Sequence, residues 1–121
     1  MANPLPDSLL GSLMTFTHRV NENLNVRRIL REWHPTVIVD VNDAAQTYCV
    51  AVDSEGVARL SDRDNVDDGR EPILVSGSAS VLEDVFAGRM DPSVAMLNGH
   101  LSVFADDRDQ FRLDAVFSLL W

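Results

Sequence analysis

The sequence predicts an α+β fold, with helices at both ends of the chain and β-strands between them. Apolar residues recur every three or four positions over residues 1 to 35. From residue 36 to residue 60 they alternate with polar residues instead, and turn residues separate the alternating runs. The segment that ends at Trp121 returns to the helical spacing. Helices grouped apart from a run of strands are typical of the α+β class.

The length of the chain predicts one domain over residues 1–121, made of a helical segment 1–35 and a sheet-containing segment 36–121. The net charge is −9, and all ten basic residues are arginines. This charge argues against nucleic acid as a partner and allows at most transient contact with a membrane. Cys49 is the only cysteine, so neither an internal disulfide nor a cysteine zinc site is expected. The N-terminus lacks the pattern of a signal peptide, and we expect a cytoplasmic protein.

The first 35 residues predict two short helices. Asp7 is the expected N-cap of the first helix, and Asn25 of the second, which Pro35 ends. The apolar stripe of the first helix consists of Leu9, Leu13, Phe16, Val20 and Leu24.

The middle of the chain predicts strands near residues 36–41, 46–52, 57–61, 72–77 and 100–105. The acidic run 61–71 predicts a solvated loop. Ser80 and Glu83 have the spacing of a capping box for a helix that closes at Gly88. The pair Asp91-Pro92 opens another short helix, which ends near Asn98-Gly99.

The final helix is expected from about residue 107 to residue 120, capped by Asp106, Asp107 or Asp109. It carries an apolar stripe of Leu113, Val116, Phe117, Leu120 and Trp121. A second apolar line lies about 150° away around the helix and consists of Phe111, Ala115 and Leu119. This line is covered either by the N-terminal helices or by an apolar ligand or a second subunit.

The residues after Gly88 resemble a known signature. The run Gly88-Arg89-Met90-Asp91-Pro92 is followed by Ala95-Met96, by Gly99-His100-Leu101-Ser102-Val103 and by Asp106. This ordered set resembles the sterol carrier protein 2 (sterol-transfer) domain family, and the order of elements agrees from about Trp33 to Trp121. The chain departs from the family pattern in having Ala105 for a glycine and His100 for a common lysine.

The resemblance implies a five-stranded mixed or antiparallel sheet with helices mainly on one face and an apolar tunnel beneath the later helices. It implies a carrier or lipid-presenting accessory protein that binds a fatty acyl, isoprenoid or sterol-like lipid without catalysis or cofactor. A homodimer or a partner enzyme is possible. Carried over position by position, the residues expected to line the tunnel are Phe86, Met90, Met96, Leu97, Leu101, Val103, Val116, Phe117 and Leu120. Trp121 is expected at the tunnel mouth as a plug.

A search for catalytic and metal-binding patterns yields no strong candidate. The histidines His18, His34 and His100 share no metal-binding spacing, and the acids of the 61–71 run do not fit a calcium loop. We therefore expect no catalytic residue and no metal ligand. One alternative is a small pocket enzyme of the ketosteroid-isomerase type with Asp40 as the base, although such folds end in strands. Another is an interaction module for a biosynthetic enzyme.

Overall fold

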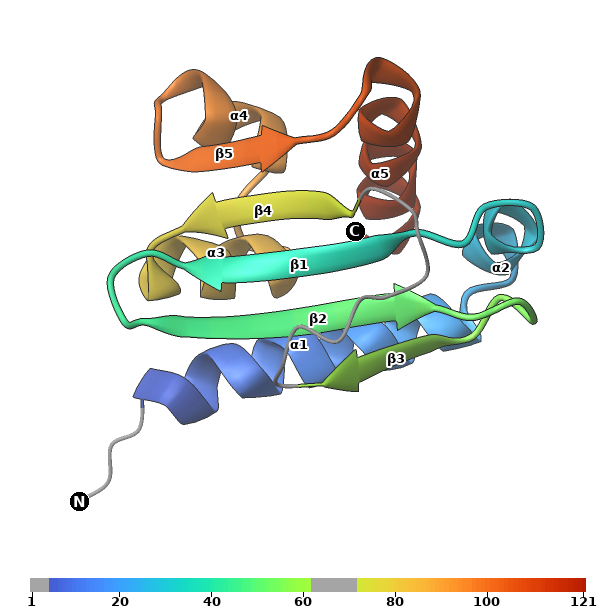
Figure 1. The fold of residues 1–121 in the computed structure, drawn as a ribbon, viewed down its shortest axis with the longest axis horizontal. Helices are drawn as coiled ribbons and strands as arrows, with labels where there is room; N and C mark the ends of the chain where they lie inside the picture. Colours follow the sequence, from blue (N-terminus) through green and yellow to red (C-terminus); the bar gives the residue numbers. More distant parts are fainter. Residues whose placement is uncertain (1–4, 62–71) are drawn as a thin grey trace.

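The computed structural model describes residues 5–61 and 72–121, with side chains from residue 9 onward. It contains five helices and five strands within these residues (Figure 1). In chain order these are α1 (Leu5–Glu22), α2 (Leu24–Leu30), β1 (Thr36–Val41), β2 (Gln46–Val52), β3 (Ala58–Ser61), β4 (Ile73–Gly77), α3 (Ala79–Phe86), α4 (Pro92–Leu97), β5 (Leu101–Phe104) and α5 (Asp107–Leu120).

The strands form one mixed sheet in the order β3-β2-β1-β4-β5. Strands β1 and β4 are parallel, and the other neighbours are antiparallel. Val37 is paired with Val50 on one side and with Ile73 on the other, so these three buried residues face the same way. Figure 1 shows α1 and α3 together on one face of the sheet. The α+β class and the five-stranded mixed sheet predicted above are confirmed.

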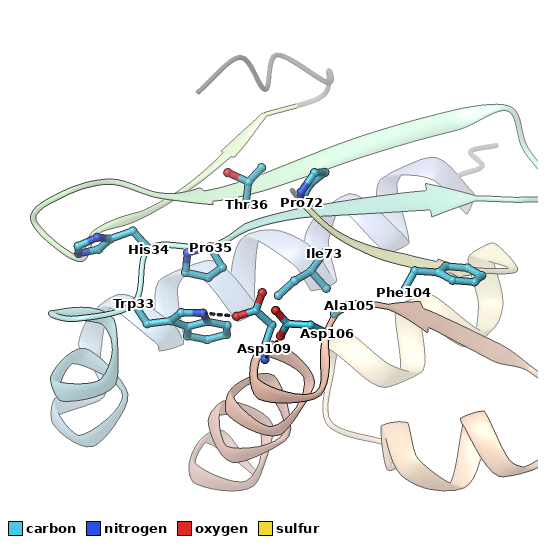
Figure 2. Close-up of a pocket in the computed structure, with 10 residues that line it drawn as sticks. All are labelled: Trp33, His34, Pro35, Thr36, Pro72, Ile73, Phe104, Ala105, Asp106 and Asp109. Atoms are coloured by element: carbon cyan, nitrogen blue, oxygen red, sulfur yellow. Dashed lines mark hydrogen bonds between the residues drawn. The ribbon is translucent and has the colours of Figure 1, made fainter. Parts of the chain in front are cut away.

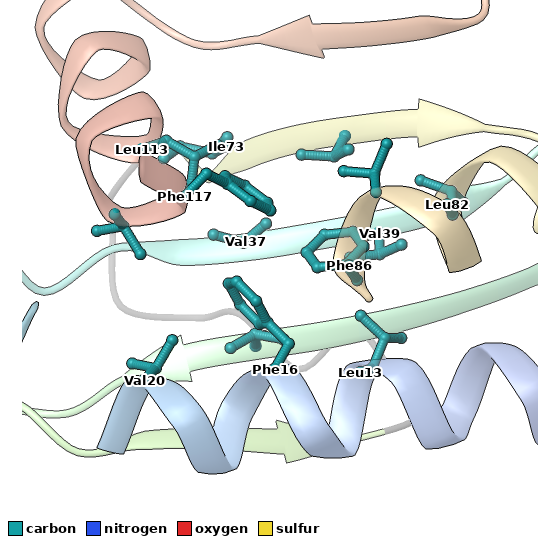
Figure 3. Close-up of a cluster of buried hydrophobic side chains, with 14 of the residues drawn as sticks. Leu13, Phe16, Val20, Val37, Val39, Ile73, Leu82, Phe86, Leu113 and Phe117 are labelled. Atoms are coloured by element: carbon teal, nitrogen blue, oxygen red, sulfur yellow. The ribbon is translucent and has the colours of Figure 1, made fainter. Parts of the chain in front are cut away.

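Three phenylalanines from three helices form the centre of the core (Figure 3). The ring of Phe16 lies 4.9 Å from that of Phe86 and 5.3 Å from that of Phe117, and the rings of Phe86 and Phe117 are 5.6 Å apart. Aromatic pairs at these separations add stability beyond the area that they bury. This cluster ties α1, α3 and α5 to one another above the sheet.

Helix α1 is also fixed to the edge of the sheet. The side-chain amide of Asn21 donates to the carbonyl oxygen of Ala58 at 2.9 Å, and Asn21 Oδ1 accepts from the backbone N–H of Ala58 at 2.8 Å. Two residues further along the chain, Asn23 Nδ2 donates to the carbonyl oxygen of Leu119 at 3.3 Å. The N-terminal helices are therefore part of the same packed layer as α5.

The boundaries of the first two helices differ from the prediction. Helix α1 begins at Leu5, so Asp7 lies inside the first turn and is not its N-cap. The N-cap of α2 is Asn23 and not Asn25, because Asn23 Oδ1 accepts from the backbone N–H groups of Asn25 and Val26 at 3.0 Å each. Helix α2 ends at Leu30, before Pro35 is reached.

The start of α3 differs in the same way. Its N-cap is Ser78 and not Ser80, since the N–H of Val81 donates to Ser78 Oγ at 3.2 Å. The predicted caps Asp91 for α4 and Asp106 for α5 are confirmed. The predicted acidic loop falls almost wholly on residues 62–71, which lie outside the described residues.

Candidate functional site

An enclosed apolar slot lies between strands β4 and β5 and helices α4 and α5. Its volume is about 10 Å³, which is room for about one water molecule. One polar contact crosses it, from Gln110 Nε2 on α5 to Met96 Sδ on α4 at 3.9 Å. The slot is lined by Val75, Val85, Pro92, Met96, Leu101, Val103, Gln110, Leu113, Asp114 and Phe117.

Helix α4 closes one side of this slot and is held by little packing. Asp91 Oδ1 accepts from the N–H of Ser93 at 2.8 Å, and Pro92 occupies the first turn. Gly99 ends the helix with φ of +78°, a conformation that favours glycine. Within the six residues of α4, only Ala95 is buried. The helix is therefore well capped at both ends but weakly anchored to the core.

A second hollow of about 430 Å³ adjoins the slot and shares Pro92, Asp114 and Phe117 with it. The indole of Trp121 lies against Gly88, where a Cβ atom would overlap the ring. Gly88 also has φ of +82°, so the position suits glycine for two reasons. We call this hollow the mouth of the slot.

The mouth carries negative charge. Asp91 and Asp114 both line it. Burial raises the pKa of Asp114 above its ordinary value, and the nearby charge of Asp91 raises that pKa further. Arg89 also lines the mouth, but it is paired with Asp84. The two aspartates therefore make this part of the surface unfavourable for an anionic group of a ligand.

Six of the ten predicted site residues lie at the slot or its mouth. Those that line the slot are Met96, Leu101, Val103 and Phe117, and those that line the mouth are Met90, Phe117 and Trp121. The structure thus brings together residues from α4, β5, α5 and the turn after α3.

The other four predicted residues lie elsewhere. Phe86 is in the aromatic cluster, and Leu120 is buried. Val116 faces a separate apolar crevice of about 30 Å³ on the α2 side of α5. Leu97 is 86% exposed at the end of α4.

Sequence reasoning did not select several residues that line the slot. Val75 and Val85 belong to a strand and a helix that were predicted correctly, but they carry no mark that separates a lining residue from a core residue. Gln110 and Asp114 also line the slot, but they are polar and were not predicted as lining residues. Their spacing of four residues, with Phe117 three residues further on, places them on one side of α5, and this spacing was the available signal.

A larger hollow of about 740 Å³ lies at the opposite end of β4 and β5 (Figure 2). Trp33 Nε1 donates to Asp109 Oδ1 at 3.0 Å across it, and Asp106 Oδ1 accepts from the N–H of Asp109 at 2.8 Å. Both carboxylates thus already serve the fold. Its lining mixes His34 and Thr36 with apolar groups, so this hollow is more polar than the slot.

The residues considered for chemistry do not converge. Asp40 lies on the sheet face opposite to the buried valines and accepts from Ser76 Oγ at 3.3 Å. His100 is exposed after α4. Among residues 5–61 and 72–121, no three histidine, cysteine, aspartate or glutamate side chains are grouped as a metal site would require. No helix within these residues is long and apolar enough to cross a membrane.

Comparison with known proteins gives structural matches only. No family model and no curated protein sequence matches the chain. The UbiJ-SCP2 ubiquinone synthesis protein is 17% identical with a TM-score of 0.70, over 96% of this chain and 97% of that chain. The sterol carrier protein domain 2 of Helicoverpa armigera is 11% identical with a TM-score of 0.67, over 97% and 91%.

The stereoselective inverting sec-alkylsulfatase Pisa1 from Pseudomonas sp. is also similar, at 18% identity and a TM-score of 0.56. The match covers 72% of this chain but only 13% of the sulfatase. Two of these three proteins match from end to end and are sterol carrier protein 2 domains by name. The chain therefore has the fold of the sterol carrier protein 2 domain.

Proposed function

We propose that this protein binds the apolar tail of a lipid in the slot between β4, β5, α4 and α5, as a carrier or as an accessory that presents the lipid to an enzyme. The proposal rests on the slot itself. Its lining is mainly apolar, and one of its walls is a six-residue helix with a single buried residue. The end-to-end match to sterol carrier protein 2 domains supports a lipid-binding function.

Lipid binding at this site requires the slot to open. Sites for small molecules usually have volumes of roughly 300–1,000 Å³, against about 10 Å³ here. Burial of each methylene group contributes about 0.8 kcal/mol, so a tail of about ten carbons supplies some 8 kcal/mol before ordering costs. Local opening of a weakly packed element costs much less than global unfolding. Outward movement of α4 is therefore compatible with useful affinity.

The accessory role is suggested by the likeness to UbiJ-SCP2, which is named a ubiquinone synthesis protein. Under this proposal the protein works in the cytoplasm and meets membranes only transiently, in keeping with its net charge of −9. A pocket enzyme of the ketosteroid-isomerase type is disfavoured because the chain ends in α5 and not in long strands.

The experiment compares two glutamate substitutions on α4. Met96→Glu places a carboxylate in the slot and should abolish binding of dodecanol to the delipidated protein, measured by isothermal titration calorimetry. Leu97→Glu changes the next residue, which is exposed, and should leave binding intact. Circular dichroism checks that both variants are folded. Full binding by a folded Met96→Glu variant would refute the slot as the site.

A further inference from the structure

A groove lined by arginines continues from the mouth of the slot. The groove has a volume of about 380 Å³ and shares Arg89 and Trp121 with the mouth. The mouth in turn shares Phe117 with the slot. The three spaces therefore form a continuous series, from an apolar end to a basic end. The groove is lined by Gly11, Ser12, Thr15, Arg19, Ala87, Arg89 and Trp121.

The charge of this groove is opposite to that of the protein as a whole. The chain has a net charge of −9, yet the described residues that line the groove include two arginines and no carboxylate. The guanidinium carbon of Arg19 lies 4.4 Å from the centre of the Trp121 ring. None of the ion pairs among the described residues involves Arg19. Arg19 is thus positioned by an aromatic ring, and its charge is not neutralised by a neighbouring acid.

Arg89 is oriented by the end of α3. Its Nε donates to Asp84 Oδ1 at 3.0 Å, and its Nη2 lies 2.9 Å from the same oxygen. Its Nη2 also lies 4.0 Å from Glu83 Oε2, so two carboxylates balance its charge and Arg19 is the cation that makes the groove basic. The planar guanidinium of Arg89 has five N–H donors, so these pairings still leave donors for a ligand. On α1, Thr15 stands about one helical turn before Arg19 and Ser12 about two turns before it, and their hydroxyl groups add further donors.

We propose that this groove binds the anionic head group of an amphiphile whose tail occupies the slot. The inference rests on the proposed function, because the head group reaches the groove only with a tail in the slot. The aspartates of the mouth repel a negative group, whereas Arg19, which lines the groove and not the mouth, attracts it. The head group therefore lies past the indole. A carboxylate and a phosphate monoester have the same acceptor chemistry for a guanidinium fork.

The test compares three ligands with the same twelve-carbon chain: dodecanoate, dodecyl phosphate and the neutral dodecanol. Calorimetric titration of the wild-type protein should give about three- to ten-fold tighter binding for at least one anion than for dodecanol, as expected for a partly exposed charged contact. The anion that binds more tightly identifies the head-group class. Arg19→Gln should remove the preference and leave dodecanol binding unchanged, and Arg19→Lys should retain most of it.

Arg59→Gln is the matched control, because it removes the same charge from an exposed position on β3. It should keep the preference for the anion. Equal affinity of wild-type protein for both anions and dodecanol would overturn the head-group site while leaving lipid binding in place. An equal loss in Arg59→Gln and Arg19→Gln would also overturn it, since net charge alone would then explain the preference. Failure of the wild-type protein to bind any of the three ligands would refute the proposed function as well.

Discussion

Truncation of Phe117 should open the slot and so separate the stability of the fold from its capacity for lipid. The ring of Phe117 lines both the slot and its mouth, and the residue is only 7% exposed. Replacement of a buried phenylalanine by alanine costs about 3–5 kcal/mol. For a domain of this length, 1 kcal/mol corresponds to a change in Tm of about 4 °C. Phe117→Ala should therefore lower the Tm of the lipid-free protein by about 12–20 °C.

The same variant should respond more strongly to lipid. In the wild-type protein a tail must first displace α4, whereas the variant already has space where the ring was. If this space improves the Kd for dodecanol about ten-fold, the gain is about 1.4 kcal/mol at a fixed saturating concentration. Dodecanol should then raise the Tm of Phe117→Ala by about 5–6 °C more than it raises that of the wild-type protein. Differential scanning calorimetry with and without dodecanol measures both quantities.

Leu13→Ala is the control for general loosening of the core. Leu13 is fully buried on α1 and does not line the slot, and its truncation costs about 2–5 kcal/mol. It should lower the Tm without enlarging the response to dodecanol. The reasoning is refuted if Phe117→Ala is destabilised but gains no more from dodecanol than the wild-type protein does. Equal gains in Phe117→Ala and Leu13→Ala would refute it too.

Two further predictions concern the mouth. Trp121→Ala removes a half-exposed indole that lies against Gly88. It should speed the release of a bound fluorescent lipid several-fold in stopped-flow measurements and leave the Tm nearly unchanged. A changed size-exclusion volume with an unchanged release rate would indicate a dimer contact instead. Asp114→Asn should stabilise the protein at neutral pH. The pKa of Asp114 in the folded protein lies above its ordinary value of 3.8, so folding favours the protonated carboxyl. This contribution to the free energy of unfolding is fully present below pH 3.8, and it is lost as the pH rises through the pKa of the folded protein. In urea titrations the gain from Asp114→Asn should therefore disappear in acid, and a gain that is equal at low and neutral pH would contradict this cause.

The strands could be predicted because apolar residues alternate along them. In β1 and β4 this alternation matches the burial, since Val37, Val39 and Val41 alternate with half-buried residues and β4 repeats the pattern. Strand β2 departs from it, because Cys49 is buried as well as its neighbours Tyr48 and Val50. The helix starts were less predictable, since several residues in a row can cap a helix. Ser78 caps α3 because β4 stays paired with β5 as far as Gly77, and the chain turns at the next residue. Nothing in the local sequence distinguishes Ser78 from Ser80.

The candidate site was only partly predictable for a related reason. A residue that lines a closed slot has the same apolar character as one that fills the core, so Phe86 and Phe117 look alike in sequence. Leu97 follows Met96 on α4 but projects outward, because a six-residue helix on the edge of the core can bury only one side. The arginine groove joins α1 to the turn after α3, and it exists only once the aromatic cluster has brought these segments together.

The distribution of burial across the two walls of the slot predicts which wall would move if a lipid binds there. Helix α5 has four buried residues and is tied to α2 by the hydrogen bond from Asn23 to Leu119. Its second apolar line is not fully covered by the N-terminal helices, since Phe111 is 77% exposed, yet the opposite stripe holds the helix firmly. Helix α4 has only Ala95 inside the core. Because the cost of opening follows the buried contacts that are lost, lipid binding in the slot, as proposed here, should displace α4 and leave α5 in place.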